Sequence, residues 1–180
     1  ELDGAVMFKA RNETGGALTK GQAVYISGVS GSTPLIALAR ANSASTMQAF
    51  GLLAADVSNN ADVNVISFGN LGDIDTSSFS AGDTVFISSA AAGALVNTAP
   101  TGTANLIQNI GKVVRSHASA GIIKVGGAGR TNATPNLNQD QAFIGNASNQ
   151  AVATNLSAIN LSKFNNDLSV ISAVVDDTSP

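Results

Sequence analysis

Cysteine and tryptophan are absent from this sequence, and charged residues make up only 12% of it. The absence of cysteine excludes disulfides, thiolate catalysis and cysteine metal ligands. Nine lysines and arginines are scattered among twelve acidic residues, so there is no basic stripe that would neutralise a run of phosphates. We therefore exclude nucleic acid as a partner. The neutral surface of small residues is compatible with close packing against other subunits.

Long apolar runs are missing as well. None reaches the roughly 18 residues that span a bilayer, so we expect no membrane insertion. The first residues also lack the basic and apolar regions of a signal peptide. The sequence does not begin with methionine, and we expect that it starts inside a longer gene product or after processing.

Short segments rich in β-branched and aromatic residues predict strands. The four clearest segments are residues 23–27, 63–68, 84–88 and 122–125. Glycine, serine, asparagine and aspartate bound these segments, which is typical of a strand-rich domain. We therefore expect a mainly β fold, either a small β-barrel or a sandwich.

The sequence also contains an internal repeat. The matching segments are 18–27 with 79–88, and 50–53 with 110–113. Two copies are too few for a solenoid, so we interpret the repeat as a duplication that builds two halves of one barrel or sandwich. Gly21 and Gly82 are structural turn residues in this interpretation. We expect each to adopt a positive φ, or to lack room for a Cβ, where the chain turns into a strand.

Changes in residue composition along the sequence predict three regions. Residues 1–125 form the duplicated β domain, and residues 126–135 form a Gly-rich linker. Residues 136–180 contain too few large apolar residues for a core of their own. We expect this region to be an extended or short-helical oligomerising tail, either intertwined with its copies or beginning a fibre shaft.

Seven apolar residues of this tail are predicted to lie at an oligomer interface. The last five are spaced three, four, three and four residues apart, which is the a/d spacing of a coiled coil. Valine and isoleucine also favour strands, so an intertwined β stem is equally consistent. Both alternatives use the same residues, which are Phe143, Ile144, Leu161, Phe164, Leu168, Ile171 and Val175.

Several polar residues are candidates for sites of chemistry. His117 lies near serines, but we interpret it as a turn residue. Asp73 and Asp75 are spaced like the start of a Ca²⁺ site, yet the further ligands of a calcium loop do not follow. Asp56 and Asp62 lack the aromatic platforms that accompany carboxylates in sugar-cleaving sites. We predict no catalytic residue, no metal and no cofactor, and therefore not an enzyme.

Residues 138–154 carry a resemblance to known proteins. Their sequence, Asn-Gln-Asp-Gln-Ala-Phe-Ile-Gly-Asn-Ala-Ser-Asn-Gln-Ala-Val-Ala-Thr, resembles short segments of tail fibres and other virion structural proteins of bacteriophages, notably those of marine and cyanobacterial hosts. Residues 15–126 are similar in style to small β domains of phage decoration and fibre proteins, in which Gly-x-x-Val-Tyr/Phe-Ile-Ser recurs. The resemblance implies a homotrimer in the virion, assembled in the host cytoplasm.

This resemblance favours a trimeric tail fibre or fibre-anchoring segment that contributes to host attachment. Its partners would be its own copies, other virion proteins and a host surface glycan. Two alternatives stay open at this point, a capsid decoration (cement) protein and a glycan-binding receptor module.

Overall fold

The computed structural model of the chain describes residues 4–102, 104–126, 131–132, 137–147 and 151–159. The described residues form twelve strands and two short 3₁₀ helices, which confirms the predicted mainly β fold. Within this part of the chain, no helix has the length and hydropathy needed to cross a membrane. The chain divides into two compact units, Glu1–Asn136 and Leu137–Pro180.

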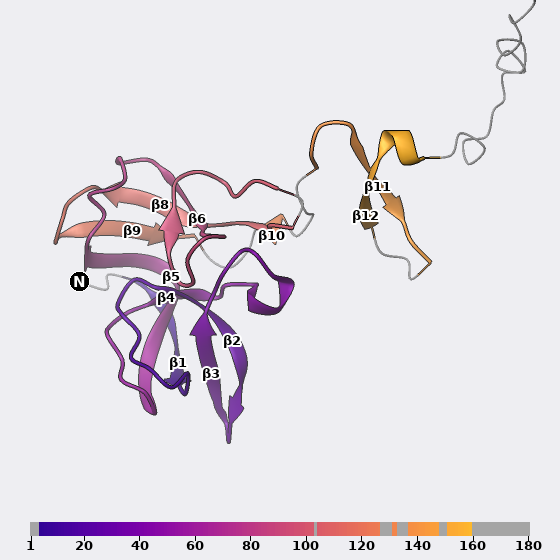
Figure 1. Cartoon of the computed structure of the whole chain (residues 1–180). Coiled ribbons are helices and arrows are strands. Elements are labelled where there is room, and N and C mark those ends of the chain that lie inside the picture. The colour runs from indigo at the N-terminus through magenta and orange to yellow at the C-terminus, as the bar shows by residue number, and fades with distance from the viewer. Residues whose placement is uncertain (1–3, 103, 127–130, 133–136, 148–150, 160–180) are drawn as a thin grey trace, which may run out of the picture. The chain divides into compact units, whose positions relative to one another are not determined.

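The first unit begins with a closed β-barrel of five strands (Figure 1). These strands are β1 (Val6–Asn12), β2 (Ala23–Ser30), β3 (Thr33–Leu38), β4 (Gly51–Leu53) and β5 (Ala61–Ile74). They pair in the order β1-β3-β2-β4-β5, and β5 pairs with β1 to close the ring. The β1–β3 pair is parallel, and the other pairs are antiparallel. A short 3₁₀ helix, η1 (Ala44–Thr46), lies between β3 and β4.

The second half of this unit is built on the same long strand, β5. Its other strands are β6 (Thr84–Ile87), β7 (Leu95–Val96), β8 (Ile107–Arg115) and β9 (Gly121–Val125). From Gly69 onward β5 pairs with β9, and the sheet continues in the order β5-β9-β8-β6-β7. Figure 1 shows β5 passing from the group of β1 to β4 into the group of β6, β8 and β9. The four strands predicted from sequence correspond to β2, β5, β6 and β9.

The two halves repeat the same turn at equivalent positions. The amide of Gly21 donates to the carbonyl of Leu53 (2.9 Å), and the amide of Gly82 donates to the carbonyl of Val113 (2.7 Å). Return bonds from the amides of Leu53 and Val113 reach the residue after each glycine, at 3.0 and 2.9 Å. The φ angles of the two glycines are 84° and 88°. Residues with a Cβ rarely adopt this conformation, so both turns favour glycine.

A second pair of glycines allows strands to approach closely. A Cβ on Gly51 would overlap the carbonyl oxygen of Ile66, and a Cβ on Gly111 would overlap that of Lys124. Gly51 begins β4. Gly111 instead lies inside β8, which begins at Ile107. The duplication therefore preserves the close approach but not the strand start.

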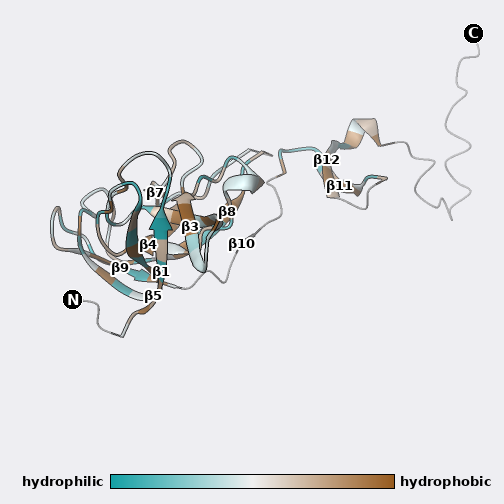
Figure 2. Ribbon diagram, turned by 90° about the horizontal axis from the view of Figure 1, so that it is seen from below, coloured by the Kyte–Doolittle hydropathy of each residue, from teal (hydrophilic) through white to brown (hydrophobic). Residues whose placement is uncertain are grey.

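The first unit contains two buried hydrophobic clusters, and Figure 2 colours its strands by hydropathy. The closed barrel encloses Ala10, Leu18, Val24, Ile36, Leu53, Val57, Val63 and Val65. The other cluster combines residues of both halves: Ala23, Ala39, Ala41, Ala49, Leu52 and Ile66 from the first, and Leu71, Val85, Ile87, Ile110, Val113, Ile123 and Val125 from the second. Val24 and Val85 occupy equivalent positions, and both are fully buried. The barrel interior is thus one cluster, whereas the other cluster is shared by the two halves.

A buried glutamine joins the two halves. The Gln108 side chain in β8 accepts from the amide of Ala49 (2.8 Å) and donates to its carbonyl (2.7 Å). Ala49 lies just before β4, in the first half, and both residues are fully buried. Because buried backbone groups need partners, Gln108 fixes this loop against the second half.

The second unit contains a hairpin of β11 (Gln141–Gly145) and β12 (Ala151–Asn155), followed by the 3₁₀ helix η2 (Leu156–Ala158). The coiled coil and the β stem both concern residues beyond 159, which lie outside the described part. The domain boundaries drawn from sequence stay predictions. Within the predicted linker, β10 (Thr131–Asn132) pairs with β8 of the first unit.

Candidate functional site

The hairpin of the second unit carries apolar side chains on both faces. Phe143 lies opposite Ala153, and Ile144 lies opposite Val152. Because successive residues of a strand point to opposite faces, Phe143 and Ile144 belong to different faces. The sequence prediction places both residues at one oligomer interface. The hairpin geometry gives each residue its own face, and their place at an oligomer interface stays a prediction.

These apolar side chains are only partly covered. Phe143 and Ile144 are half-buried, and Val152 is 44% exposed. A side-chain hydrogen bond from Gln141 Nε2 to Asn155 Oδ1 (3.0 Å) ties the open end of the hairpin together. An isolated two-stranded hairpin is only marginally stable in water. The hairpin is therefore a candidate assembly surface.

The other five residues predicted at the oligomer interface lie outside the described residues. They are Leu161, Phe164, Leu168, Ile171 and Val175. Their place in an oligomer stays a prediction.

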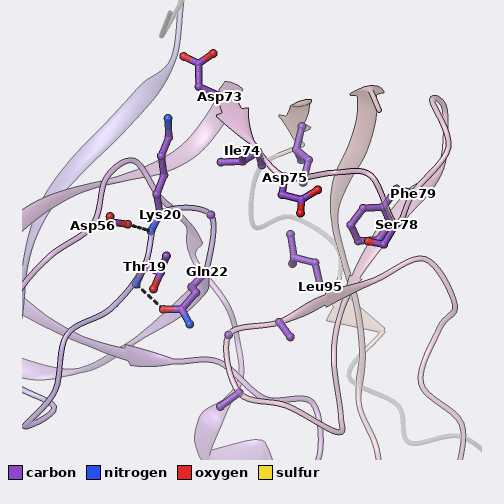
Figure 3. A pocket seen from close by; sticks show the side chains of 15 residues that line it. Thr19, Lys20, Gln22, Asp56, Asp73, Ile74, Asp75, Ser78, Phe79 and Leu95 are labelled. Atoms are coloured by element: carbon purple, nitrogen blue, oxygen red, sulfur yellow. Dashed lines mark hydrogen bonds between the residues drawn. The ribbon is translucent and has the colours of Figure 1, made fainter. Parts of the chain in front are cut away.

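The first unit has a second candidate surface, an open hollow of about 700 Å³ (Figure 3). Three segments supply most of its lining: the turn Thr19–Gln22, the end of β5 at Asp73–Asp75, and the segment Ala92–Leu95 that leads into β7. Figure 3 shows Ile74 and Asp75 on the segment across the hollow from Leu95. We name this hollow, between Asp73–Asp75 and Ala92–Leu95, the open seam.

The open seam has an acidic lining. Three aspartates line it, Asp56, Asp73 and Asp75, together with one cation, Lys20. Asp56 accepts from the backbone amide of Lys20 (2.8 Å). Asp75 Oδ1 accepts from the hydroxyl (2.7 Å) and the amide (2.9 Å) of Ser77. These hydrogen bonds lower the pKa of Asp75, which is therefore ionised at neutral pH.

His117 holds a turn together, as its sequence interpretation proposes. Its Nδ1 accepts from the amides of Ser119 (3.1 Å) and Ala120 (3.0 Å), between β8 and β9. Its backbone carbonyl accepts from the amide of Thr76 (2.9 Å). The ring nitrogen that would serve as a base is thus occupied by the turn.

The other acidic candidates take part in separate structural contacts. Asp62 forms ion pairs with Lys9 (2.9 Å) and Arg11 (3.3 Å), and the hydrogen bond from Lys9 is the main cause of its lowered pKa. In the described part of the chain, no three histidine, aspartate or glutamate side chains gather closely enough to hold a metal ion.

Sequence reasoning missed the open seam. A signal for it existed in the unequal lengths of the repeated segments. The first copy contains the apolar run Thr33–Leu38, whereas the second copy has only Ala94–Val96 before polar residues resume. The corresponding strands, β3 and β7, have six and two residues.

No protein-family model matches the chain, and no curated protein matches it either. Among solved structures, the chain is similar to the N base of the head fiber gp8.5 of bacteriophage phi29. The identity is 16% and the TM-score 0.44, with 67% of this chain and 93% of that chain covered. At this level of similarity, an assignment of function has to come from the residues themselves.

Proposed function

We propose that the chain is a structural, non-enzymatic component of a bacteriophage particle. In this proposal it forms a homotrimeric tail fibre or fibre-anchoring segment that contributes to host attachment. The observation that carries the proposal is the hairpin β11–β12, whose two faces both present apolar side chains.

Such a hairpin gains stability when other chains cover it. In an assembly around an axis, one face can pack toward the axis while the other packs against a neighbouring copy. Burial of apolar surface contributes about 25 cal/mol for each Å² removed from water. The small residues Ala142, Ala151 and Ala153 would let neighbouring backbones approach closely. Obligate oligomers use apolar interfaces of this kind.

The sequence resemblance supports the same surface. Residues 138–154, which resemble segments of phage fibres and other virion proteins, include all but the last residue of the hairpin. The low content of charged residues also suits permanent subunit contacts. His117 takes part in a turn, and Asp62 takes part in an ion pair.

The oligomeric state of two hairpin variants tests the proposal. Phe143→Asp and Ile144→Asp each place a carboxylate on a different face of the hairpin. We expect the whole chain to be a trimer by light scattering coupled to size-exclusion chromatography. Either substitution should shift it to monomer, because burying an unpaired charge costs several kcal/mol.

Val29→Asp is the matched control, because Val29 is a 65% exposed apolar residue of the first unit. This variant should stay trimeric. A monomeric unmodified chain, or a Phe143→Asp variant that remains fully trimeric, would contradict the proposed assembly surface.

Labelling of the protein on intact particles tests the tail location. Signal at the tail supports a fibre, whereas signal over the shell would replace it with the capsid decoration alternative. A glycan array tests a direct receptor role, since binding above background would support the glycan-binding alternative.

A further inference from the structure

The two halves of the first unit differ at one junction. In the closed half, β3 pairs with β1, and Leu35 and Ile36 lie opposite Arg11 and Asn12. The matching junction in the second half would join β7 to the end of β5. Among the described residues, β7 pairs only with β6, and β5 beyond Gly69 pairs only with β9. The second half is therefore open where the first is closed.

The β-ladders identify the residue of β7 that corresponds to the closed junction. Ile36 lies opposite Ile26 in the first half. Leu95 lies opposite Ile87, which occupies the position of Ile26 in the second copy of the repeat. Leu95 is thus the counterpart of Ile36.

A similar turn follows the matching stretch of β5. Asn12 Oδ1 accepts from the amide (3.1 Å) and the hydroxyl (2.8 Å) of Thr14. Asp75 Oδ1 accepts from the same two groups of Ser77, at 2.9 and 2.7 Å. The β-ladders place Ile74, the residue before Asp75, at the position of Asn12, because Asn12 lies opposite Ala61 and Ile74 lies opposite Gly121. The closed pair Ile36–Asn12 therefore corresponds to Leu95 and Ile74 on either side of the open seam.

The open seam combines features that suit an extended peptide. Its apolar floor is formed by side chains that pack against the core, namely those of Ile74, Phe79 and Leu95. Its two sides are the end of β5 and the short strand β7, each with a strand edge that lacks a partner strand in the described residues. Unpaired strand edges bind extended segments through main-chain hydrogen bonds.

We propose that the open seam is a docking site for an extended segment of a partner protein, one that carries an apolar side chain next to a basic one. The apolar side chain covers Ile74 and Leu95. The basic side chain pairs with Asp75. This proposal is independent of the hairpin interface, because the seam lies entirely within the first unit.

The charge of the lining selects among partners. Three aspartates against a single lysine favour a basic segment over an acidic one. Like an ordinary aspartate, Asp75 is ionised at neutral pH, and its hydrogen bonds with Ser77 lower its pKa further. Strand pairing therefore supplies the affinity, and charge supplies the selectivity.

The closed half provides a probe for this site. The probe is a synthetic peptide with the sequence of residues 32–40, Ser-Thr-Pro-Leu-Ile-Ala-Leu-Ala-Arg, with blocked termini and a fluorescent label. It contains the strand that closes the first half and ends in a cation. Binding to the whole chain is followed by fluorescence anisotropy. We expect saturable binding that weakens when glutamate replaces the peptide arginine.

Two changes in the chain locate the binding. Ala92→Trp fills the seam at an exposed position and should weaken binding about tenfold or more, or about 1.4 kcal/mol. Ala90→Trp is the control, because Ala90 is also exposed but does not line the seam. The triple variant Asp56→Asn, Asp73→Asn, Asp75→Asn keeps the hydrogen-bond acceptors. It should remove the preference for the basic peptide and most of the salt dependence.

Absence of binding would overturn the proposal. The aspartates would then serve to prevent other strands from pairing with this strand edge. Equal binding by Ala92→Trp and the unmodified chain would overturn it too. A third outcome concerns self-association. If the unmodified chain forms dimers that Ala92→Trp disrupts and Phe143→Asp does not, a second copy of the chain occupies the seam. This result would overturn the proposal of a partner protein.

Discussion

The closed and open halves of the first unit share the same hydrogen-bonded turns. They differ in whether their strands pair into a closed ring. Both use a glycine with positive φ to enter the second strand, and both bring two strands together across a glycine. Among the described residues, only the first half closes its ring, through the β1–β3 pair. A duplication can therefore keep the turns that define a fold while one copy loses a strand contact and gains a free surface.

The strongest test of this equivalence is substitution of the close-approach glycines. Gly51→Ala and Gly111→Ala each force a Cβ into a backbone carbonyl of the neighbouring strand. We expect each to lower the free energy of unfolding by about 3 kcal/mol or more, measured by urea denaturation, because the backbones must separate. Gly16→Ala is the control, since a Cβ at Gly16 has no atom within 4 Å. A small effect at only one of the two sites would mean that the halves are not equivalent there.

A smaller effect is expected at the link between the halves. Gln108→Leu leaves the amide and carbonyl of Ala49 buried without their partner. We expect a loss of about 2–4 kcal/mol in the free energy of unfolding. If Gln108 couples the halves, unfolding followed by two different probes should also cease to coincide. A single cooperative transition of unchanged midpoint would show that the halves are joined by other contacts alone.

The same truncation in each half compares how the two cores respond. Val24→Ala and Val85→Ala remove equal volume from equivalent, fully buried positions. Each should cost about 2 kcal/mol in unfolding free energy, with the larger loss at Val24. The cost of a cavity depends on how far its surroundings collapse, and a closed ring collapses less than an open one. Equal losses would indicate that the open half is as rigid as the closed barrel.

The sequence predicts the fold well because its signals are local. Runs such as 23–27 and 84–88 are rich in β-branched residues, and glycines mark the turns that precede them. The open seam depends instead on whether two distant strands meet. The match of apolar and polar residues between the two copies of the repeat does not show whether these strands pair. The short apolar run at Leu95 indicates only that the two copies differ there.

The candidate assembly surface shows the same limit. The apolar character of Phe143 and Ile144 is evident from the sequence, and both were predicted at an oligomer interface. That they lie on opposite faces follows only once the segment is known to be a strand, because a helix would place adjacent residues about 100° apart.

The last difference between the halves is one of charge, and it predicts different responses to acid. Asp83 accepts from the amide of Ser80 (3.0 Å) and from the side chain of Asn97 (3.1 Å), which lowers its pKa. At the equivalent place in the closed half, Gln22 accepts from the amide of Thr19 (2.8 Å). A lowered carboxyl pKa stabilises the folded state above the ordinary aspartate value of about 4. This contribution is lost as the pH falls through the folded value.

Thermal unfolding between pH 6 and pH 2 measures this contrast. Asp83→Gln copies the closed half, and its unfolding temperature should fall less with acid than that of the unmodified chain. The converse change, Gln22→Asp, should make the fall steeper. Asp62, whose pKa Lys9 lowers, is common to all three proteins, so the differences among them report the turns alone. Parallel pH curves for the three proteins would mean that both turns are held by backbone hydrogen bonds, without a contribution from side-chain charge.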